Sequence, residues 1–124
     1  MAPFRNILVP LDGSELAEKA LEPANQIAMA MVQRGKEAPV VKLTLLRALS
    51  PMALLAADPY LYDEMMRMSE DEARAYLNHI ASTLTASAVA IETRIVKGSP
   101  ADAIVQYAEE DKADLIEMSS HGRT

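Results

Sequence analysis

The sequence predicts an α/β protein whose doubly wound parallel sheet lies in a three-layer α/β/α arrangement. Short apolar runs alternate with helical segments along the chain, and turn residues or helix caps separate them. Strict alternation of strands and helices requires parallel strands with right-handed crossovers and helices on both faces. The 124 residues suffice for one domain, and the sequence shows no internal repeat or linker.

The first strand is expected at residues 6–11, NILVPL, because a short apolar run without alternation is typical of a strand buried on both faces. Residues 12–14, Asp-Gly-Ser, end it, and Ser14 is a favoured N-cap for a helix that continues to Arg34. Pro23 lies inside this helical pattern. We expect a kink there rather than an end, because the apolar positions continue beyond it.

The second strand is expected at residues 40–49 and the third at residues 90–97, whose alternating apolar positions favour a place near a sheet edge. Between them, residues 50–59 are expected to form an apolar loop and residues 60–86 to contain a helix. Capping-box spacing at Ser69 favours a short helix followed by a long one.

Ser99 and Pro100 predict the next helix, since serine is favoured as N-cap and proline at the first helical position. The last strand is expected at residues 115–118. If strands one to three run outward in order, strand four must return to the other side of strand one. The ligand crevice of such a sheet then lies between the carboxyl ends of strands one and four.

Two loops rich in glycine and serine meet at that crevice, residues 10–14 and 119–122. Asp12 ends the first strand, where a carboxylate can accept hydrogen bonds from ribose hydroxyls or help to hold a metal. The alternative is that Asp12 only bonds within its own loop or caps the first helix, together with Gly13 and Ser14.

Composition excludes several classes of function. The net charge of −6 disfavours a nucleic-acid surface, which needs clustered cations. The longest uncharged apolar stretch, residues 48–57, is too short to span a bilayer, and no signal peptide is recognisable, so a cytoplasmic protein is expected. No cysteine and only two histidines make a transition-metal site improbable. No catalytic motif is present, so we expect no enzyme activity; a weak ATPase is the alternative, and the sequence names no base or nucleophile for it.

Three segments carry a resemblance: NILVPLDGSELAEKAL, KGSPADAIVQYAEEDKADLI and MSSHGRT. In this order and spacing they resemble the universal stress protein family over essentially the whole chain. The resemblance implies an adenine nucleotide alpha hydrolase-like sheet of order 3-2-1-4-5. It also implies a stress-response module that holds ATP or AMP, with Mg²⁺, in the crevice and acts through partners or dimerisation.

The resemblance further implies the residues of the nucleotide site. Asp12 matches the family's first-strand acid, Pro10 and Leu11 match its neighbours, and Ala48 matches the strand-two position beside the adenine. The remaining residues of the implied site follow the fourth strand: Met118, Ser119, Ser120, His121 and Gly122.

Two departures from the family pattern qualify this expectation. Ser119 stands where the first glycine of the phosphate loop belongs, and its Cβ and hydroxyl weaken the binding prediction, although the hydroxyl could also bond a phosphate. The chain stops before the family's last Gly-Ser loop and fifth strand. Residues 1–124 are therefore expected to be a single, C-terminally incomplete domain, and the resemblance implies a homodimer in the full-length form. The alternative function is a scaffold or interaction member that binds no nucleotide.

The eight methionines are most simply read as gap-fillers in a core that has few aromatic residues. The segment DEMMRM at residues 63–68 allows another reading, because it lies beside the apolar residues 50–59. Together these two segments are a candidate surface for a partner.

Overall fold

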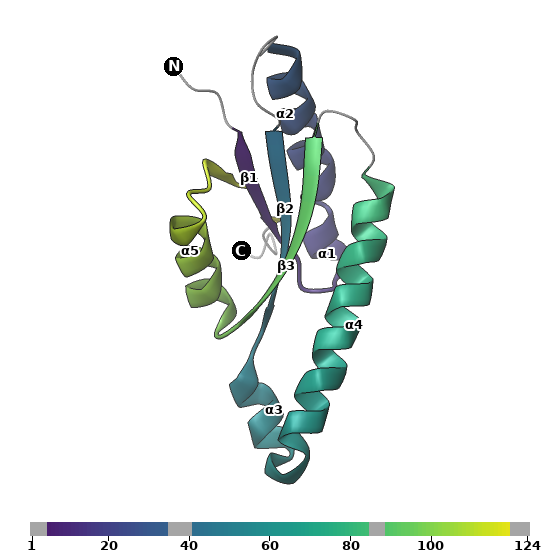
Figure 1. Ribbon diagram of the computed structural model, residues 1–124, viewed down its shortest axis with the longest axis vertical. Coiled ribbons are helices and arrows are strands. Elements are labelled where there is room, and N and C mark those ends of the chain that lie inside the picture. Colours follow the sequence, from purple (N-terminus) through teal and green to yellow (C-terminus); the bar gives the residue numbers. More distant parts are fainter. Residues whose placement is uncertain (1–4, 35–40, 85–88, 120–124) are drawn as a thin grey trace.

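The computed structural model describes residues 5–34, 41–84 and 89–119. Its four strands form one sheet in which every neighbouring pair is parallel, in the order β3-β2-β1-β4 (Figure 1). The doubly wound parallel sheet that the sequence predicts is thus confirmed, including the return of the fourth strand to the far side of the first. The strands are β1 (Asn6–Pro10), β2 (Val41–Leu49), β3 (Val89–Lys97) and β4 (Leu115–Ile116).

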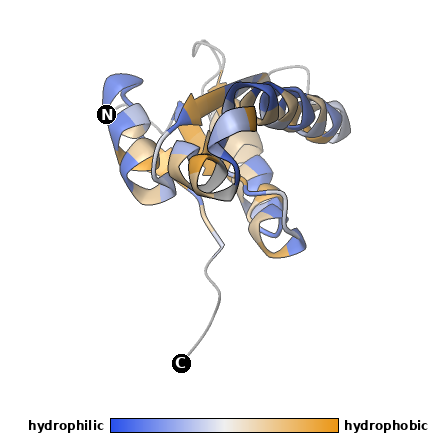
Figure 2. Cartoon of the chain, turned by 90° about the horizontal axis from the view of Figure 1, so that it is seen from below, coloured by the Kyte–Doolittle hydropathy of each residue, from blue (hydrophilic) through white to orange (hydrophobic). Residues whose placement is uncertain are grey.

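The helices cover both faces of the sheet, with α5 on one side and α1, α2 and α4 on the other (Figure 1). Hydrophobic colouring is concentrated in the strands and on the inward sides of the helices (Figure 2). The helical elements are α1 (Glu15–Glu18), α2 (Leu21–Arg34), α3 (Pro51–Ala57), the 3₁₀ turn η1 (Pro59–Leu61), α4 (Tyr62–Thr83) and α5 (Pro100–Glu110). None of the helices in the described ranges has the length and apolar composition needed to cross a membrane.

The main core lies between the sheet and the layer of α2 and α4. Ile7 and Val9 of β1 are fully buried, as expected of a strand covered on both faces. Ala24 and Ala28 are four residues apart, so they lie on one face of α2, and their small side chains let this helix approach the strands closely. Leu77 of α4 completes the same cluster.

The prediction of a single helix with a kink at Pro23 is wrong, because the helix is interrupted earlier, at Lys19 and Ala20. The N–H groups of these two residues donate to carbonyl oxygens three residues back, at 3.2 Å each, which turns the chain tightly. Pro23 then lies in the first turn of α2. Its missing N–H costs little there, since the first four N–H groups of a helix have no partner within it.

The prediction of a loop at residues 50–59 is also wrong, because α3 and the start of η1 occupy this segment. Pro51 suits the first position of a helix, and the Ala, Leu and Met residues that follow have high helix propensity. The chain turns at Asp58, whose carboxylate accepts hydrogen bonds from the N–H groups of Tyr60 at 3.0 Å and Leu61 at 3.3 Å.

Two element boundaries and one helix cap differ from those expected. Ser69 starts no helix, because α4 is continuous and Ser69 lies in its interior. Ser99 occupies the N-cap position of α5, but its side chain makes no capping hydrogen bond. Strand β4 ends at Ile116 rather than Met118, although the N–H of Glu117 still donates to the carbonyl oxygen of Leu8 at 2.9 Å.

Candidate functional site

A cavity of about 320 Å³ lies at the carboxyl ends of β1 and β2, beside the start of α5 and the residues that follow β4. Its volume is within the range of small-molecule sites. Six of the nine residues implied by the resemblance line it: Pro10, Leu11, Asp12, Ala48, Met118 and Ser119. The other three, Ser120, His121 and Gly122, lie outside the described residues.

Sheet geometry brings these residues together. Pro10 is in register with Leu46 of β2, and the N–H of Leu11 donates to the carbonyl oxygen of Leu46 at 2.8 Å, which extends the pairing past the end of β1. Leu46 and Ala48 are two residues apart, so both side chains point to the face covered by α5. The cavity is therefore built on this face, where the strands end.

Four lining residues were missed by sequence reasoning: Ala17, Leu46, Pro100 and Ile104. Period-two alternation in β2 was the available signal for Leu46, since it places this residue on the face of Ala48. Pro100 and Ile104 are four residues apart in α5 and so share one side of that helix. Their contribution depends on how α5 packs across the sheet, which no local pattern reports.

The cavity wall is mainly apolar. Among the described lining residues, the only polar side chains are those of Asp12 and Ser119. Apolar walls with a few polar groups that fix orientation are typical of sites for small organic ligands. The lining suits a flat, largely apolar ring with hydroxyl groups at the end where Asp12 lies.

Asp12 is held in place by Ser14. Its Oδ1 atom accepts hydrogen bonds from the N–H of Ser14 at 2.9 Å and from the Ser14 hydroxyl at 2.6 Å, and the Ser14 Oγ atom accepts from the N–H of Ala17 at 3.1 Å. The two bonds from Ser14 lower the pKa of Asp12 below 3.8, and the nearby charge of Arg47 acts in the same direction. Asp12 is therefore ionised at neutral pH. Within the described part of the chain, its Oδ2 atom makes no hydrogen bond.

The loop that carries Asp12 rests on a second cluster, on the opposite face of the sheet. Gly13 has φ +90°, which an L side chain rarely adopts, and a β-carbon there would lie 3.2 Å from Nη1 of Arg47. The Arg47 guanidinium lies over the ring of Tyr76 in α4, and the Tyr76 hydroxyl donates to Oε2 of Glu18 at 2.6 Å. Sequence reasoning missed this cluster. The available signal was Arg47, because period-two alternation in the apolar strand β2 places this charged residue on the same face as buried apolar residues.

The described residues offer no preformed metal centre, because they contain no group of three or more His, Asp or Glu side chains suited to a metal ion. Asp12 is a single carboxylate at the cavity. A Mg²⁺ ion would therefore depend on phosphate oxygens of a bound ligand for most of its coordination.

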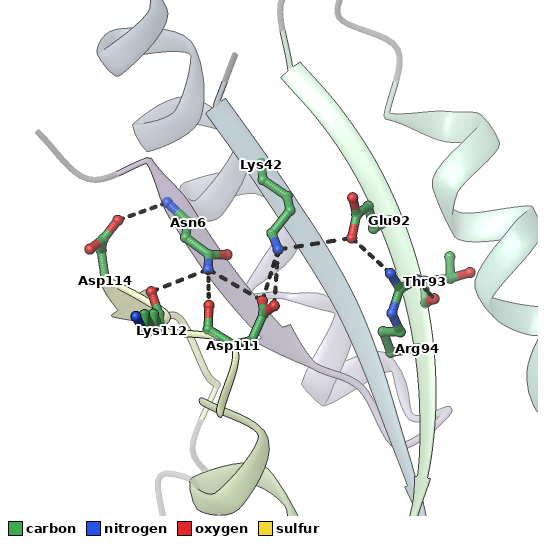
Figure 3. Close-up of polar contacts among 8 residues, drawn as sticks. All are labelled: Asn6, Lys42, Glu92, Thr93, Arg94, Asp111, Lys112 and Asp114. Atoms are coloured by element: carbon green, nitrogen blue, oxygen red, sulfur yellow. Dashed lines mark hydrogen bonds and ion pairs between the residues drawn. The ribbon is translucent and has the colours of Figure 1, made fainter. Parts of the chain in front are cut away.

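A polar network occupies the amino end of the sheet, where β1 and β2 begin (Figure 3). Lys42 of β2 pairs with both carboxylate oxygens of Asp111, at 2.9 and 3.1 Å, and lies 3.9 Å from Glu92 of β3. The Asn6 side-chain amide donates to the carbonyl oxygen of Asp111 at 2.6 Å. The network ties three strands to the end of α5 at the opposite end of the strands from Asp12, so its position indicates a structural role.

Comparison with known proteins decides the family. The model of the Universal stress protein family matches residues 3–124.

The chain belongs to the universal stress protein family.

Curated members of the family match the chain over nearly its whole length. The universal stress protein Rv1636 of Mycobacterium tuberculosis (strain H37Rv) is 32% identical over 126 residues, which cover 98% of this chain and 80% of the relative. The universal stress protein MJ0531 of Methanocaldococcus jannaschii is 29% identical over 121 residues, which cover 98% of this chain and 67% of the relative.

Solved structures of this family have the same fold. The structure of the hypothetical protein MJ0577 of Methanocaldococcus jannaschii has a TM-score of 0.79 at 26% identity, and the match covers 98% of this chain and 78% of that chain. A universal stress protein crystallised in complex with cAMP has a TM-score of 0.55 at 31% identity, and the match covers 93% of this chain and 72% of that chain. The α/β fold that the sequence predicts is thus confirmed.

Proposed function

We propose that this universal stress protein binds an adenine nucleotide in the cavity at the carboxyl ends of β1 and β2, beside the residues that follow β4. One observation carries the proposal: three separate segments bring Asp12, Ala48 and Ser119 to a single, mainly apolar cavity. The complex of a related universal stress protein with cAMP supports the same class of ligand.

The lining gives each part of a nucleotide a suitable environment. The apolar side chains of Leu46, Ala48 and Ile104 offer a surface for the adenine ring. The Oδ2 atom of Asp12 is available as an acceptor for ribose hydroxyl groups, and Ser14 already fixes this carboxylate. A preformed acceptor loses little conformational entropy on binding. Phosphates would extend toward Ser119 and the residues that follow it.

We further propose that the nucleotide acts as a signal and not as a substrate. The polar side chains in the described lining are one carboxylate, which Ser14 keeps ionised, and one hydroxyl. Within residues 5–34, 41–84 and 89–119, neither has a neighbouring base that would activate a nucleophile. On this proposal the protein acts as a stress-response module, through partners or by pairing with a second copy.

Calorimetric titration of the chain with Mg-ATP, AMP and cAMP tests the proposal. The variant Asp12→Asn keeps an oxygen for Ser14 but removes the negative charge from the cavity. We expect at least one ligand to bind the wild type and this variant to bind it about tenfold more weakly, a change of about 1.4 kcal/mol. Asp63→Asn, an exposed position on α4, is the matched control and is expected to leave affinity unchanged. Equal affinity of both variants would remove Asp12 from the site.

A second candidate is a member of the family that binds no nucleotide and serves as an interaction module. It is favoured by Ser119, which occupies the family's glycine position and lines the cavity. It is also favoured by Asp12, whose bonds to Ser14 explain its presence as part of the cap of α1. An absence of binding heat and of thermal stabilisation with all three ligands would support this candidate.

A further inference from the structure

Large apolar side chains are exposed mainly in one part of the chain. Among the residues whose side chains the structure describes, nine large hydrophobic ones are exposed, and five of them lie between positions 52 and 68. These five belong to α3, η1 and the first part of α4: Met52, Leu55, Tyr60, Leu61 and Met68. We call this group, together with Met65, the tip patch, because α3 lies beyond the ends of the strands (Figure 1). A grouped apolar surface is typical of an interaction site, whereas single exposed apolar residues are ordinary.

Helix α4 separates a core-facing side from the side that carries the tip patch. Met66 and Ala73 are buried and pack against Leu49 of β2. Met65 and Met68, three residues apart, lie instead along a shallow groove of about 240 Å³ that Ser69 and Glu72 complete. Met68 is 65% exposed and therefore fills no gap in the core, as the gap-filler reading of the methionines would require.

The surroundings of the tip patch are strongly acidic. Residues 58–72 contain six Asp or Glu residues and one Arg, which gives a formal charge of −5. Glu70 is paired with Lys97 and Asp71 with Arg74. The other four carboxylates of this segment have no ion pair with the described residues: Asp58, which accepts hydrogen bonds from the backbone of η1, and Asp63, Glu64 and Glu72. Exposed apolar side chains and unpaired carboxylates thus occur together in this segment, and Glu72 lines the groove beside Met65 and Met68. We call these carboxylates the negative rim of the patch.

We propose that the tip patch docks a basic amphipathic helix of a partner protein. The apolar face of such a helix would lie on the methionine and leucine side chains, and its Lys or Arg residues would pair with Asp63, Glu64 and Glu72. Flexible methionine side chains adapt well to the apolar face of a helix. A second copy of the chain is a poorer occupant, because it would bring the same negative rim and its own net charge of −6.

Binding of defined synthetic peptides tests this proposal. The probe is a fluorescently labelled helical peptide of Leu and Lys with Leu at the spacing of one helix face. The first comparison peptide has Glu in place of Lys, and the second contains the same Leu and Lys residues in scrambled order. We expect anisotropy to report binding of the amphipathic Leu-Lys peptide alone, with weaker binding at high salt because rim charges contribute. Equal binding of either comparison peptide would overturn the proposal.

Variants of the protein locate the binding surface. Met68→Gln removes an exposed apolar contact while keeping a side chain compatible with a helix, and we expect about tenfold weaker binding of the Leu-Lys peptide. Val105→Gln on α5, where Val105 is 55% exposed, is the matched control and should bind as the wild type does. The double variant Asp63→Asn and Glu64→Gln should reduce the salt dependence of the affinity for the Leu-Lys peptide. Glu109→Gln is its control and should leave that salt dependence unchanged. Thermal unfolding of each variant checks that the fold is retained.

Two further measurements distinguish docking of a partner helix from nucleotide binding and from self-association. The variant Asp12→Asn should bind the Leu-Lys peptide as the wild type does, so failure of the nucleotide proposal leaves this one standing. Sedimentation over a range of protein concentrations tests the second copy as occupant. A dimer that Met68→Gln abolishes and Val105→Gln retains would assign the tip patch to self-association and overturn the proposal.

Discussion

The guanidinium group of Arg47 lies over the aromatic ring of Tyr76, with 5.6 Å between the Arg47 Cζ atom and the ring centroid. Arg47 also packs against Gly13, next to Asp12, and the Tyr76 hydroxyl is bonded to Glu18 of α1. Strand β2 and helix α4 thus both support the loop that carries the acid of the candidate site. The position of Asp12 depends on contacts on the face of the sheet opposite to the cavity.

The hydrogen bond between Tyr76 and Glu18 can be removed without disturbing the stacking. Tyr76→Phe keeps the ring under Arg47, and we expect the free energy of unfolding to fall by about 1–2 kcal/mol, since the lost bond has a charged acceptor. Burial, and then the bond to Glu18, raise the pKa of Tyr76 above its ordinary value of 10.0. The stabilisation is therefore fully present below pH 10.0, and it declines at higher pH as the hydroxyl of the unfolded chain ionises first. Urea unfolding measures the change. Tyr60→Phe, at a position 97% exposed, is the control, and an equal loss there would contradict the assignment.

The pair Lys42–Asp111 predicts a pH dependence of stability with two limits. Burial opposes ionisation of Asp111, but hydrogen bonds from Lys42 and Asn6 outweigh this effect and hold the pKa of Asp111 below 3.8. The contribution of Asp111 to stability is therefore present above pH 3.8 and is lost as the pH falls through the folded-state pKa. The bond to Asp111 raises the pKa of Lys42 above 10.5. That contribution is present below pH 10.5 and lost as pH rises through the folded-state value.

Replacing the acid of this pair measures its contribution. Asp111→Asn is expected to cost about 1 kcal/mol at neutral pH, because both side chains are about one-quarter exposed and solvent screens the pair. The difference from the wild type should shrink below pH 3.8 and above pH 10.5 in urea unfolding. Asp71→Asn, which breaks the more exposed pair with Arg74, should have little effect. A difference that stays constant across this pH range would show that charge pairing is not its source.

Thr44 is a buried polar residue whose replacement should stabilise the protein. Its side chain is fully buried in β2, and the Oγ1 atom has no hydrogen-bond partner in the described structure. Thr44→Val keeps the branched shape and removes the buried hydroxyl, so we expect the free energy of unfolding to rise by about 1 kcal/mol. Thr93→Val, at a half-buried position of β3, is the control and should gain less. A loss of stability in Thr44→Val would show that the hydroxyl is satisfied.

Most strands and helix starts could be predicted because their signals are local. The apolar run at residues 6–11, the N-cap Ser14 and the helix-starting Pro100 each identify an element from neighbouring residues alone. Once the elements alternate, the rules of parallel sheets leave few topologies, and the crevice follows from the order of the strands. That is why Asp12 and Ser119, more than 100 positions apart in sequence, were expected at one site and line one cavity.

The features that were not predicted depend on tertiary contacts or on competition between local preferences. Arg47 and Tyr76 meet only because α4 crosses β2, and no motif links them. Residues 51–57 form a helix because Pro51 suits its first position and the residues that follow have high helix propensity. The helix breaks before Pro23 because the chain turns tightly at Lys19. The expected kink at Pro23 would instead have kept one continuous helix.

Ser119 determines how well the cavity accepts a nucleotide, if the proposed function holds. Among the described non-glycine residues, Lys112 alone has a positive φ, so the backbone at Ser119 needs no glycine. Ser119→Gly therefore changes the wall mainly by removing a Cβ atom and a hydroxyl. We expect affinity for the bound nucleotide to rise several-fold in calorimetric titration, because the ligand can approach the backbone more closely.

The same replacement should lower the free energy of unfolding by about 0.5–1 kcal/mol, since glycine increases the conformational entropy of the unfolded chain. Ala113→Gly, which is not part of the cavity lining, is the matched control for this entropic cost and should leave affinity unchanged. If Ser119→Gly instead binds more weakly, the Ser119 hydroxyl contributes a hydrogen bond to the nucleotide. The serine would then be an adaptation of this chain to its ligand, and the glycine of the family pattern would not be needed for binding here.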